Sequence, residues 1–175
     1  MLKPGDKAPV FDLPSAVDES IGRVSLGTLR TEMVVIFFYP RDFSFICPTE
    51  VIGFHKHHED FAKASASIIG ISVDDVESHR RWAKELGGVG YPLAADAKGE
   101  VARLYGVFDD KEQVAMRATF ILDRQRTIAY AVASQINVGR SVSETLRVVK
   151  ALRSGQLCPA DWQPGDAAGP DGLKY

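Results

Sequence analysis

The apolar residues in the first half of this chain follow two kinds of pattern. Residues 33–39 and 67–73 are nearly unbroken apolar runs, which are typical of strands buried on both faces of a sheet. Residues 48–61 and 76–86 carry apolar side chains at steps of three and four, the spacing of a helix with one buried face. A glycine pair at 87–88 should end the second helix. The order strand, helix, strand, helix predicts parallel strands joined by right-handed helical crossovers.

The pattern changes in the second half. A short helix is expected at residues 100–105, and residues 118–134 form two apolar runs separated by DRQR, which indicates an antiparallel hairpin. The last helix should begin at Ser141, because SVSE is a capping box. Residues 154–175 are rich in Gly, Pro and Asp, and we expect this tail to be mobile or dependent on a partner. The prediction is one α/β domain, residues 1–153, with a central mixed sheet flanked by helices, followed by the tail.

Composition narrows the class of protein. The chain has 175 residues, 45% of them hydrophobic and 25% charged, with a formal net charge of -2, as expected for one soluble globular domain. There is no basic excess, so we do not expect it to bind nucleic acid. No apolar run approaches the ~20 residues of a membrane span, and Pro4 and Gly5 interrupt the segment where a secretory signal would lie. We therefore expect a cytoplasmic protein without a membrane partner.

The two cysteines, Cys47 and Cys158, are too few for a secreted disulfide framework, so each is inert, metal-binding or catalytic. Cys47 lies where an apolar strand gives way to a helix with proline at its first position. The positive end of the helix dipole and unpaired backbone N–H groups there favour a thiolate over a thiol. The alternative reading of Cys47 is a small buried hydrophobic residue.

Other candidate chemistry is weak. His55 and His58 are spaced at i and i+3 and could share a metal, but only Glu59 adds a further ligand type nearby, and a half-packed histidine is commoner. The chain shows no phosphate loop, dinucleotide fingerprint or Ser-His-Asp constellation. We expect no metal and no cofactor.

Three separated motifs resemble those of peroxiredoxins. FYPRDFSFICPTE resembles the family's active-site segment, with Pro40, Ser44 and Cys47 at the matching positions. RATFILD, which begins at Arg117, resembles the strand that carries the catalytic arginine, and LCPADWQPG resembles the segment of the resolving cysteine, here Cys158. The likeness runs from about residue 4 to residue 165. It points to the typical two-cysteine subclass, of the alkyl hydroperoxide reductase C or thioredoxin peroxidase type, and implies a thioredoxin-like fold.

The resemblance also implies a reaction and a role for each residue. The Cys47 thiolate would attack a peroxide oxygen and become a sulfenic acid, without metal, haem or flavin. Because nucleophilicity falls as a thiolate becomes less basic, a fast peroxidase also needs donors aimed at the breaking O–O bond. Arg117 would contact both the sulfur and the peroxide, and Ser44 would position the substrate. Pro40 would shield the thiolate from water. The alternative for Arg117 is a surface arginine bound to a carboxylate, and the alternative for Ser44 is a serine in a turn.

Glu50 lies in the first helical turn after Cys47, where its negative charge would oppose the thiolate. By family likeness, Arg117 and Arg140 could neutralise that charge, which would make Glu50 a positioning residue. The alternative is a carboxylate that serves only the helix dipole.

The resemblance implies that Cys158 of one copy condenses with the Cys47 sulfenic acid of another, in a homodimer that could also assemble into a decameric ring. Thioredoxin or a dedicated flavoprotein disulfide reductase would then reduce the disulfide. A redox-regulated holdase chaperone or a peroxide-sensing thiol relay is the alternative function, and a Cys47→Ser variant separates them because only the peroxidase needs that thiol. A disulfide oxidoreductase is disfavoured because the chain has no CxxC.

The segment GGVG at residues 87–90 resembles the GGLG motif of peroxiredoxins that are sensitive to sulfinic acid formation. The companion Tyr-Phe helix has no counterpart in DAAGPDGLKY, so we expect easy local unfolding and resistance to overoxidation. Rapid build-up of sulfinic acid on Cys47 at modest peroxide concentrations would contradict this. The competing reading of the glycines is a plain helix stop.

Overall fold

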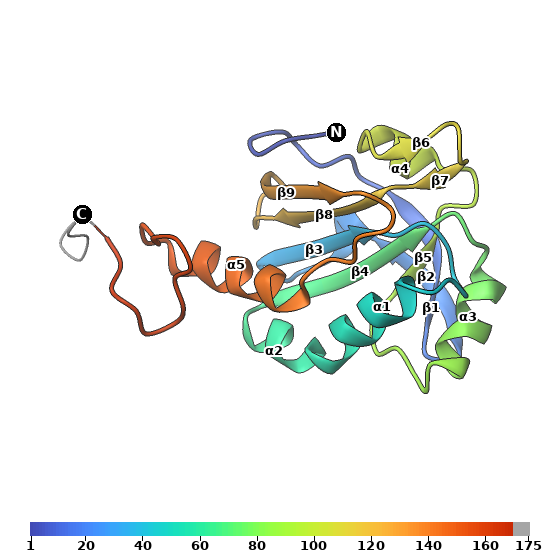
Figure 1. Cartoon of the computed structure of the whole chain (residues 1–175), viewed down its shortest axis with the longest axis horizontal. Helices are drawn as coiled ribbons and strands as arrows, with labels where there is room; N and C mark the ends of the chain where they lie inside the picture. Colours follow the sequence, from blue (N-terminus) through green and yellow to red (C-terminus); the bar gives the residue numbers. More distant parts are fainter. Residues whose placement is uncertain (170–175) are drawn as a thin grey trace.

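A seven-stranded sheet forms the centre of the computed structural model, in which residues 1–169 are described (Figure 1). Its order is β2-β1-β5-β4-β3-β8-β9, and a separate two-stranded sheet pairs β6 with β7. The strands are β1 (Asp12–Val17), β2 (Ser20–Ser25), β3 (Met33–Phe38), β4 (Ala66–Ser72), β5 (Leu93–Ala95), β6 (Phe108–Asp109), β7 (Val114–Ala115), β8 (Arg117–Leu122) and β9 (Ile128–Ser134). The helices are η1 (Leu26–Thr28, a 3-10 turn), α1 (Cys47–Lys56), α2 (His58–Lys63), α3 (Val76–Glu85), α4 (Glu100–Leu104) and α5 (Val142–Ser154).

The sheet is mixed, as predicted. β3, β4 and β5 run parallel in its centre, while β8 pairs antiparallel with β3 and β9 pairs antiparallel with β8. The chain passes from β3 through α1 and α2 to β4, and from β4 through α3 to β5. This arrangement confirms the predicted α/β class, the strand-helix alternation and the hairpin.

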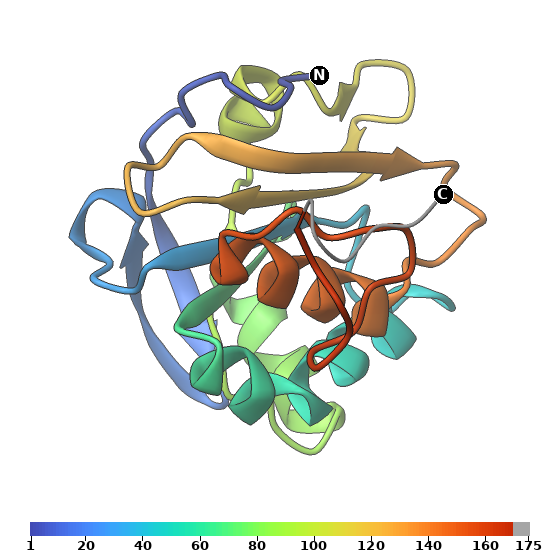
Figure 2. The same ribbon diagram turned by 90° about the vertical axis from the view of Figure 1, so that its left-hand side faces the viewer.

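The unbroken apolar run of β3 is explained by burial on both sides of the sheet. Val35 and Phe37 belong to one apolar cluster, which also holds side chains of α1, α2, α3 and α5, whereas Val34 and Ile36 belong to another, beside α4. Figure 2 shows α5 and the α1–α2 pair on one side of the sheet and α4 on the other. Because successive side chains of a strand point to opposite faces, a strand covered on both faces has no polar positions.

The predicted single helix at residues 48–61 is wrong in one respect, because the structure has two helices there. His57 has φ -100° and ψ 8°, which ends α1 before α2 begins. The His57 amide still donates to the Gly53 carbonyl, and Phe54 still packs on Phe61 with ring centroids 5.8 Å apart. Two short helices therefore satisfy the same apolar spacing as one long helix.

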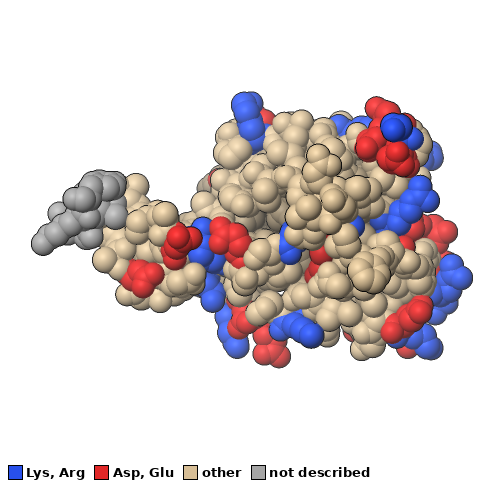
Figure 3. All heavy atoms as spheres, viewed as in Figure 1, with Lys and Arg blue, Asp and Glu red and all other residues tan. Residues whose placement is uncertain are grey.

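The tail after α5 is described as far as residue 169. Gly155 ends α5 in the left-handed conformation, and Trp162 is buried again, with its carbonyl accepting from Arg147 Nη1 at 3.3 Å. The described part of the tail projects from the main body beyond α5 (Figure 3). The boundary at residue 153 stays a prediction, and residues 170–175 lie outside the described residues. Within residues 1–169, no helix is both long and apolar enough to cross a bilayer.

Gly70, in the middle of β4, is closely packed against side chains of β3 and β5. A Cβ atom there would lie 2.7 Å from Cζ of Phe37 and 3.0 Å from Cδ2 of Leu93. Gly70→Ala should therefore lower the free energy of unfolding by about 1–3 kcal/mol through overpacking. Urea unfolding measures this. Gly22→Ala, an edge-strand glycine with no atom within 4 Å of its added Cβ, is the control, and equal losses in both variants would contradict the packing argument.

Candidate active site

Cys47 is the first residue of α1 and follows the loop that leaves β3. Its side chain is fully buried, and its amide donates to Ser44 Oγ at 3.4 Å. No side chain caps the start of α1. The sulfur therefore lies at the positive end of the helix, as the sequence pattern predicted.

Arg117 reaches Cys47 because β8 begins beside the end of β3, with Ala118 opposite Phe38. Its Nη1 donates to Cys47 Sγ at 3.2 Å and to Glu50 Oε2 at 2.7 Å. Its Nε donates to the carbonyl of Ile136 at 2.7 Å. The guanidinium is 4% exposed, so it acts on the sulfur with little screening by water.

Glu50 lies one turn after Cys47 and is clamped by two arginines. Oε1 accepts from the backbone amide and the Nε of Arg140, both at 2.9 Å, while Oε2 accepts from Arg117. Arg140 also donates to the Phe38 carbonyl at 2.6 Å and to Thr119 Oγ1 at 3.1 Å. The predicted neutralisation of Glu50 therefore has the required geometry.

The charged side chains around Cys47 carry a net positive charge. Two guanidiniums, those of Arg117 and Arg140, face one carboxylate, that of Glu50, which leaves one positive charge beside Cys47. Burial lowers the pKa of Arg140 below its usual value, and the charge of Glu50 opposes that shift. A buried positive charge of this kind stabilises an anion placed beside it.

A pocket of about 320 Å³ is lined by Arg117 and Ser44, both of which contact Cys47, although Cys47 itself does not line it. Pro40, Ser44 and Arg117, all predicted as substrate-binding residues, lie together in its wall. The other wall residues are Arg41, Glu112, Val114 and Ile136. Sequence reasoning missed Glu112, Val114 and Ile136, because nothing in the local pattern shows that the β6–β7 segment and the loop after β9 meet here, and it did not single out Arg41 within the segment around Cys47.

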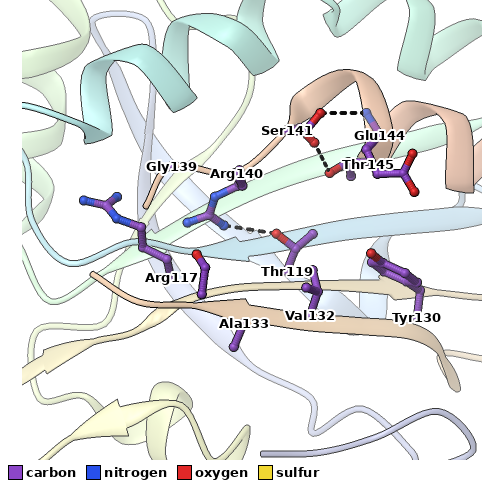
Figure 4. Close-up of a pocket in the computed structure, with 11 residues that line it drawn as sticks. Arg117, Thr119, Tyr130, Val132, Ala133, Gly139, Arg140, Ser141, Glu144 and Thr145 are labelled. Carbon is purple, nitrogen blue, oxygen red and sulfur yellow. Dashed lines mark hydrogen bonds between the residues drawn. The ribbon is translucent and has the colours of Figure 1, made fainter. Parts of the chain in front are cut away.

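A second cavity, of about 220 Å³, lies between β8, β9 and the start of α5 (Figure 4). Arg117, Thr119 and Arg140 line it, and Arg140 bonds to Thr119 across one wall. At the far end of this cavity, burial raises the pKa of Tyr130 above its usual value, and the nearby charge of Glu144 adds to that shift. Both arginines of the Glu50 cluster therefore also line this second cavity.

Cys158 lies at the other end of α5 from this cluster. Arg140 precedes the first residue of α5, whereas Cys158 Sγ is 3.8 Å from the Ala151 carbonyl and 3.5 Å from Ser154 Oγ, at the end of the helix. Thirteen helical residues span roughly 20 Å. Both cysteines are free, and the structure does not bring them together within one copy. Leu152, on α5, is 37% exposed and lines a groove together with Cys158.

The GGVG segment has the geometry of a helix stop. Gly87 and Gly88 have φ of 84° and 112°, and the Gly88 amide donates to the Ala83 carbonyl at the end of α3. Next, the Gly90 amide donates to His55 Nδ1 at 3.1 Å, which occupies that histidine nitrogen. Within residues 1–169, no group of three or more potential metal-ligating side chains comes together. The relation of this segment to overoxidation stays a prediction.

Comparison with known proteins agrees with this geometry. The AhpC/TSA family matches residues 4–131. A Synechocystis protein named as a candidate peroxiredoxin is 42% identical over 95% of this chain and 88% of its own length. The crystal structure of reduced Plasmodium vivax 2-Cys peroxiredoxin superposes with a TM-score of 0.87 at 31% identity, covering 96% of this chain and 93% of that one. Mycobacterium tuberculosis AhpC gives 0.85 at 31% identity, covering 93% and 99%.

The family match covers more than half of the chain, and the superpositions extend over nearly all of it. The folds that match are those of peroxiredoxins, so the predicted thioredoxin-like architecture is confirmed. The chain therefore belongs to the AhpC/TSA family, as a typical two-cysteine peroxiredoxin with thiol peroxidase activity.

Proposed function

We propose that this peroxidase reduces hydrogen peroxide and organic hydroperoxides through a sulfenic acid on Cys47. The thiolate attacks the terminal peroxide oxygen, the O–O bond breaks, and the leaving oxygen takes a proton to become water or an alcohol. The observation that carries the proposal is the single nitrogen, Arg117 Nη1, that donates to both Cys47 Sγ and Glu50 Oε2. Glu50 fixes this donor at the edge of the pocket where the peroxide would enter.

Ser44 would hold the substrate from the other side. Its hydroxyl accepts from the Cys47 amide and can turn its own proton toward a peroxide in the pocket. Pro40, buried in the same wall, would keep bulk water away from the thiolate. Arg140 would not contact the peroxide, and instead its Nε donates to Glu50 Oε1.

We propose that the Cys47 sulfenic acid condenses with Cys158 of the partner subunit, releasing water and forming an intersubunit disulfide. The position of Cys158 at the far end of α5 supports this pairing over one within a single copy. A thioredoxin or a dedicated flavoprotein disulfide reductase would then restore both thiols. We expect a homodimer, and possible assembly into a decamer, in a cytoplasm whose thiols are kept reduced.

Peroxide consumption coupled in turn to each candidate reductant tests the function. The peroxidase should turn over with at least one of thioredoxin and the flavoprotein reductase, for hydrogen peroxide and for an alkyl hydroperoxide. Peroxide loss limited to one equivalent of enzyme with both reductants would contradict the recycling scheme.

The intersubunit disulfide makes a separate prediction. After one equivalent of peroxide, the wild type should run as a dimer on a non-reducing denaturing gel, and Cys158→Ser should run as a monomer, because it lacks the second sulfur. Both should run as monomers after reduction. An oxidised wild type that stays monomeric would refute the pairing between subunits.

A further inference from the structure

A buried hydrogen-bonded cluster holds the loop that leads into Cys47. The Asp42 carboxylate, fully shielded from solvent, accepts from Tyr39 Oη at 2.9 Å, Ser78 Oγ at 2.8 Å and His79 Nδ1 at 2.9 Å. Burial and the Asp42 charge raise the pKa of Tyr39 well above its usual value, so that its hydroxyl remains a donor. Three donors thus converge on one carboxylate of the catalytic loop.

The backbone of the same residue is fixed as well. The Asp42 amide donates to Asp74 Oδ2 at 2.9 Å, and Ser72 Oγ donates to the same oxygen at 2.6 Å. His79 is fully buried, and its Nε2 has no hydrogen-bond partner among the described residues. Because Nδ1 faces a carboxylate, we assign the hydrogen to Nδ1, which leaves only a lone pair on Nε2.

This cluster takes no part in the contacts at the reacting sulfur. Among the described residues, the Asp42 side chain bonds only to Tyr39, Ser78 and His79, and none of these bonds to Cys47, Arg117 or Glu50. The cluster can therefore affect the reaction only by changing the position of the loop that carries Cys47.

The second chemical step requires that loop to move. Cys47 is fully buried, whereas a disulfide needs Cα atoms about 4.4–6.8 Å apart and room for the second chain. The buried sulfur contacts Arg117 of β8, and Cys47 is carried by the start of α1 and the loop that precedes it. A second chain can approach the sulfur only after this segment opens. Two anchors resist opening: the Glu50–arginine cluster, which belongs to the peroxide site, and the Asp42 cluster, which does not.

We propose that Asp42, Ser78, His79 and Tyr39 form a loop latch, a set of positioning residues that sets the rate of disulfide formation. This role rests on the proposed function, because it concerns the step after the sulfenic acid forms. The closed latch holds Ser44 and Cys47 in place for attack on the peroxide. Its release lets Cys47 leave the pocket and meet Cys158 of the partner subunit.

Two substitutions should open the latch without touching the peroxide site. Ser78→Ala and His79→Leu each remove one donor to Asp42, and the loss of one buried hydrogen bond should shift the opening equilibrium about tenfold. Hydrogen exchange of residues 40–47 should rise by that factor, as should the rate of disulfide formation after a peroxide pulse. Single-turnover peroxide consumption should stay within about twofold of wild type, because the closed loop still forms the site.

Two further variants are matched controls. His79→Asn keeps a donor that can reach Asp42, and should restore near-wild-type opening. Asp96→Asn weakens another buried carboxylate, which accepts from the amides of Val101 and Ala102 at the start of α4, on the opposite side of the sheet. It should leave exchange in residues 40–47 unchanged.

The measurements separate the latch from general destabilisation and from the proposed function. Faster opening in Asp96→Asn as well as in the latch variants, or unchanged opening in Ser78→Ala and His79→Leu, would overturn the latch. Equal losses in the peroxide step and in disulfide formation would overturn it too. If the wild type forms no disulfide although hydrogen exchange shows normal opening of residues 40–47, the proposed pairing of Cys47 with Cys158 is wrong. The latch would then have no disulfide step to control.

Discussion

Arg117→Lys should lower kcat/KM for hydrogen peroxide by about 10²–10³-fold, the usual loss on removing one preorganised donor from a transition state. The variant keeps the positive charge, so the loss would come from geometry. Stopped-flow measurement of Cys47 oxidation gives this value directly. A loss below about fivefold would show that charge alone is enough.

The expected loss arises because the Arg117 guanidinium donates hydrogen bonds to three acceptors at once. Arg117 Nε is held by the Ile136 carbonyl, which leaves Nη1 facing Cys47 Sγ at 3.2 Å and Glu50 Oε2 at 2.7 Å. A lysine ammonium is a compact charge without this planar fork, and it cannot keep all three contacts at once. The donor aimed at the breaking O–O bond should therefore be lost even though the field remains.

Arg126→Lys is the matched control. Arg126 is half-buried, and its guanidinium donates to the carbonyls of Leu29 and Thr31, at 2.8 and 3.2 Å, in a purely structural role. The control should lose some stability and keep its peroxide rate. If both variants lost activity alike, the effect would belong to folding and not to the donor.

Much of this site follows from local sequence. The apolar run of β3, Pro48 and the spacing between Cys47 and Glu50 are local features, and they place the thiol and the carboxylate on one turn of α1. The capping box at Ser141 likewise predicted the start of α5, where the Ser141 hydroxyl accepts from the Glu144 amide. Arg117 and Arg140 were identified by resemblance, because the pairing of β8 with β3 brings Arg117 to the sulfur, and Arg140, just before α5, reaches Glu50 only in the folded chain.

Two of the features that sequence reasoning missed depend on contacts between distant segments. The carbonyl of Ile136 orients Arg117 through a backbone atom, which no residue type encodes. His79 is buried on α3, and its bond to Asp42, 37 residues away in the chain, forms only because the fold brings α3 to the catalytic loop. The break at His57 is equally invisible, because both sides keep helical spacing.

Glu50→Gln should lower the free energy of unfolding by about 3–5 kcal/mol, the cost of leaving buried charges without their partner. The Glu50 side chain is 1% exposed and accepts from Arg117 and Arg140, which are 4% and 7% exposed. With a glutamine, two guanidiniums would face each other with no carboxylate between them, and an amide nitrogen would point at one of their donors. Guanidinium chloride unfolding of the reduced protein measures the loss.

A surface pair shows what burial contributes. Glu144 pairs with Arg147 one turn along α5 at 2.6 Å, but its side chain is 46% exposed, so Glu144→Gln should cost less than about 1 kcal/mol.

Arg140→Met should also destabilise the protein, since it leaves Glu50 with Arg117 alone. The double variant, Glu50→Gln with Arg140→Met, should lose less stability than the sum of the single losses, because each single change strands a charge that the double change removes. Strict additivity would mean that Arg140 is balanced by its carbonyl acceptors and not by Glu50.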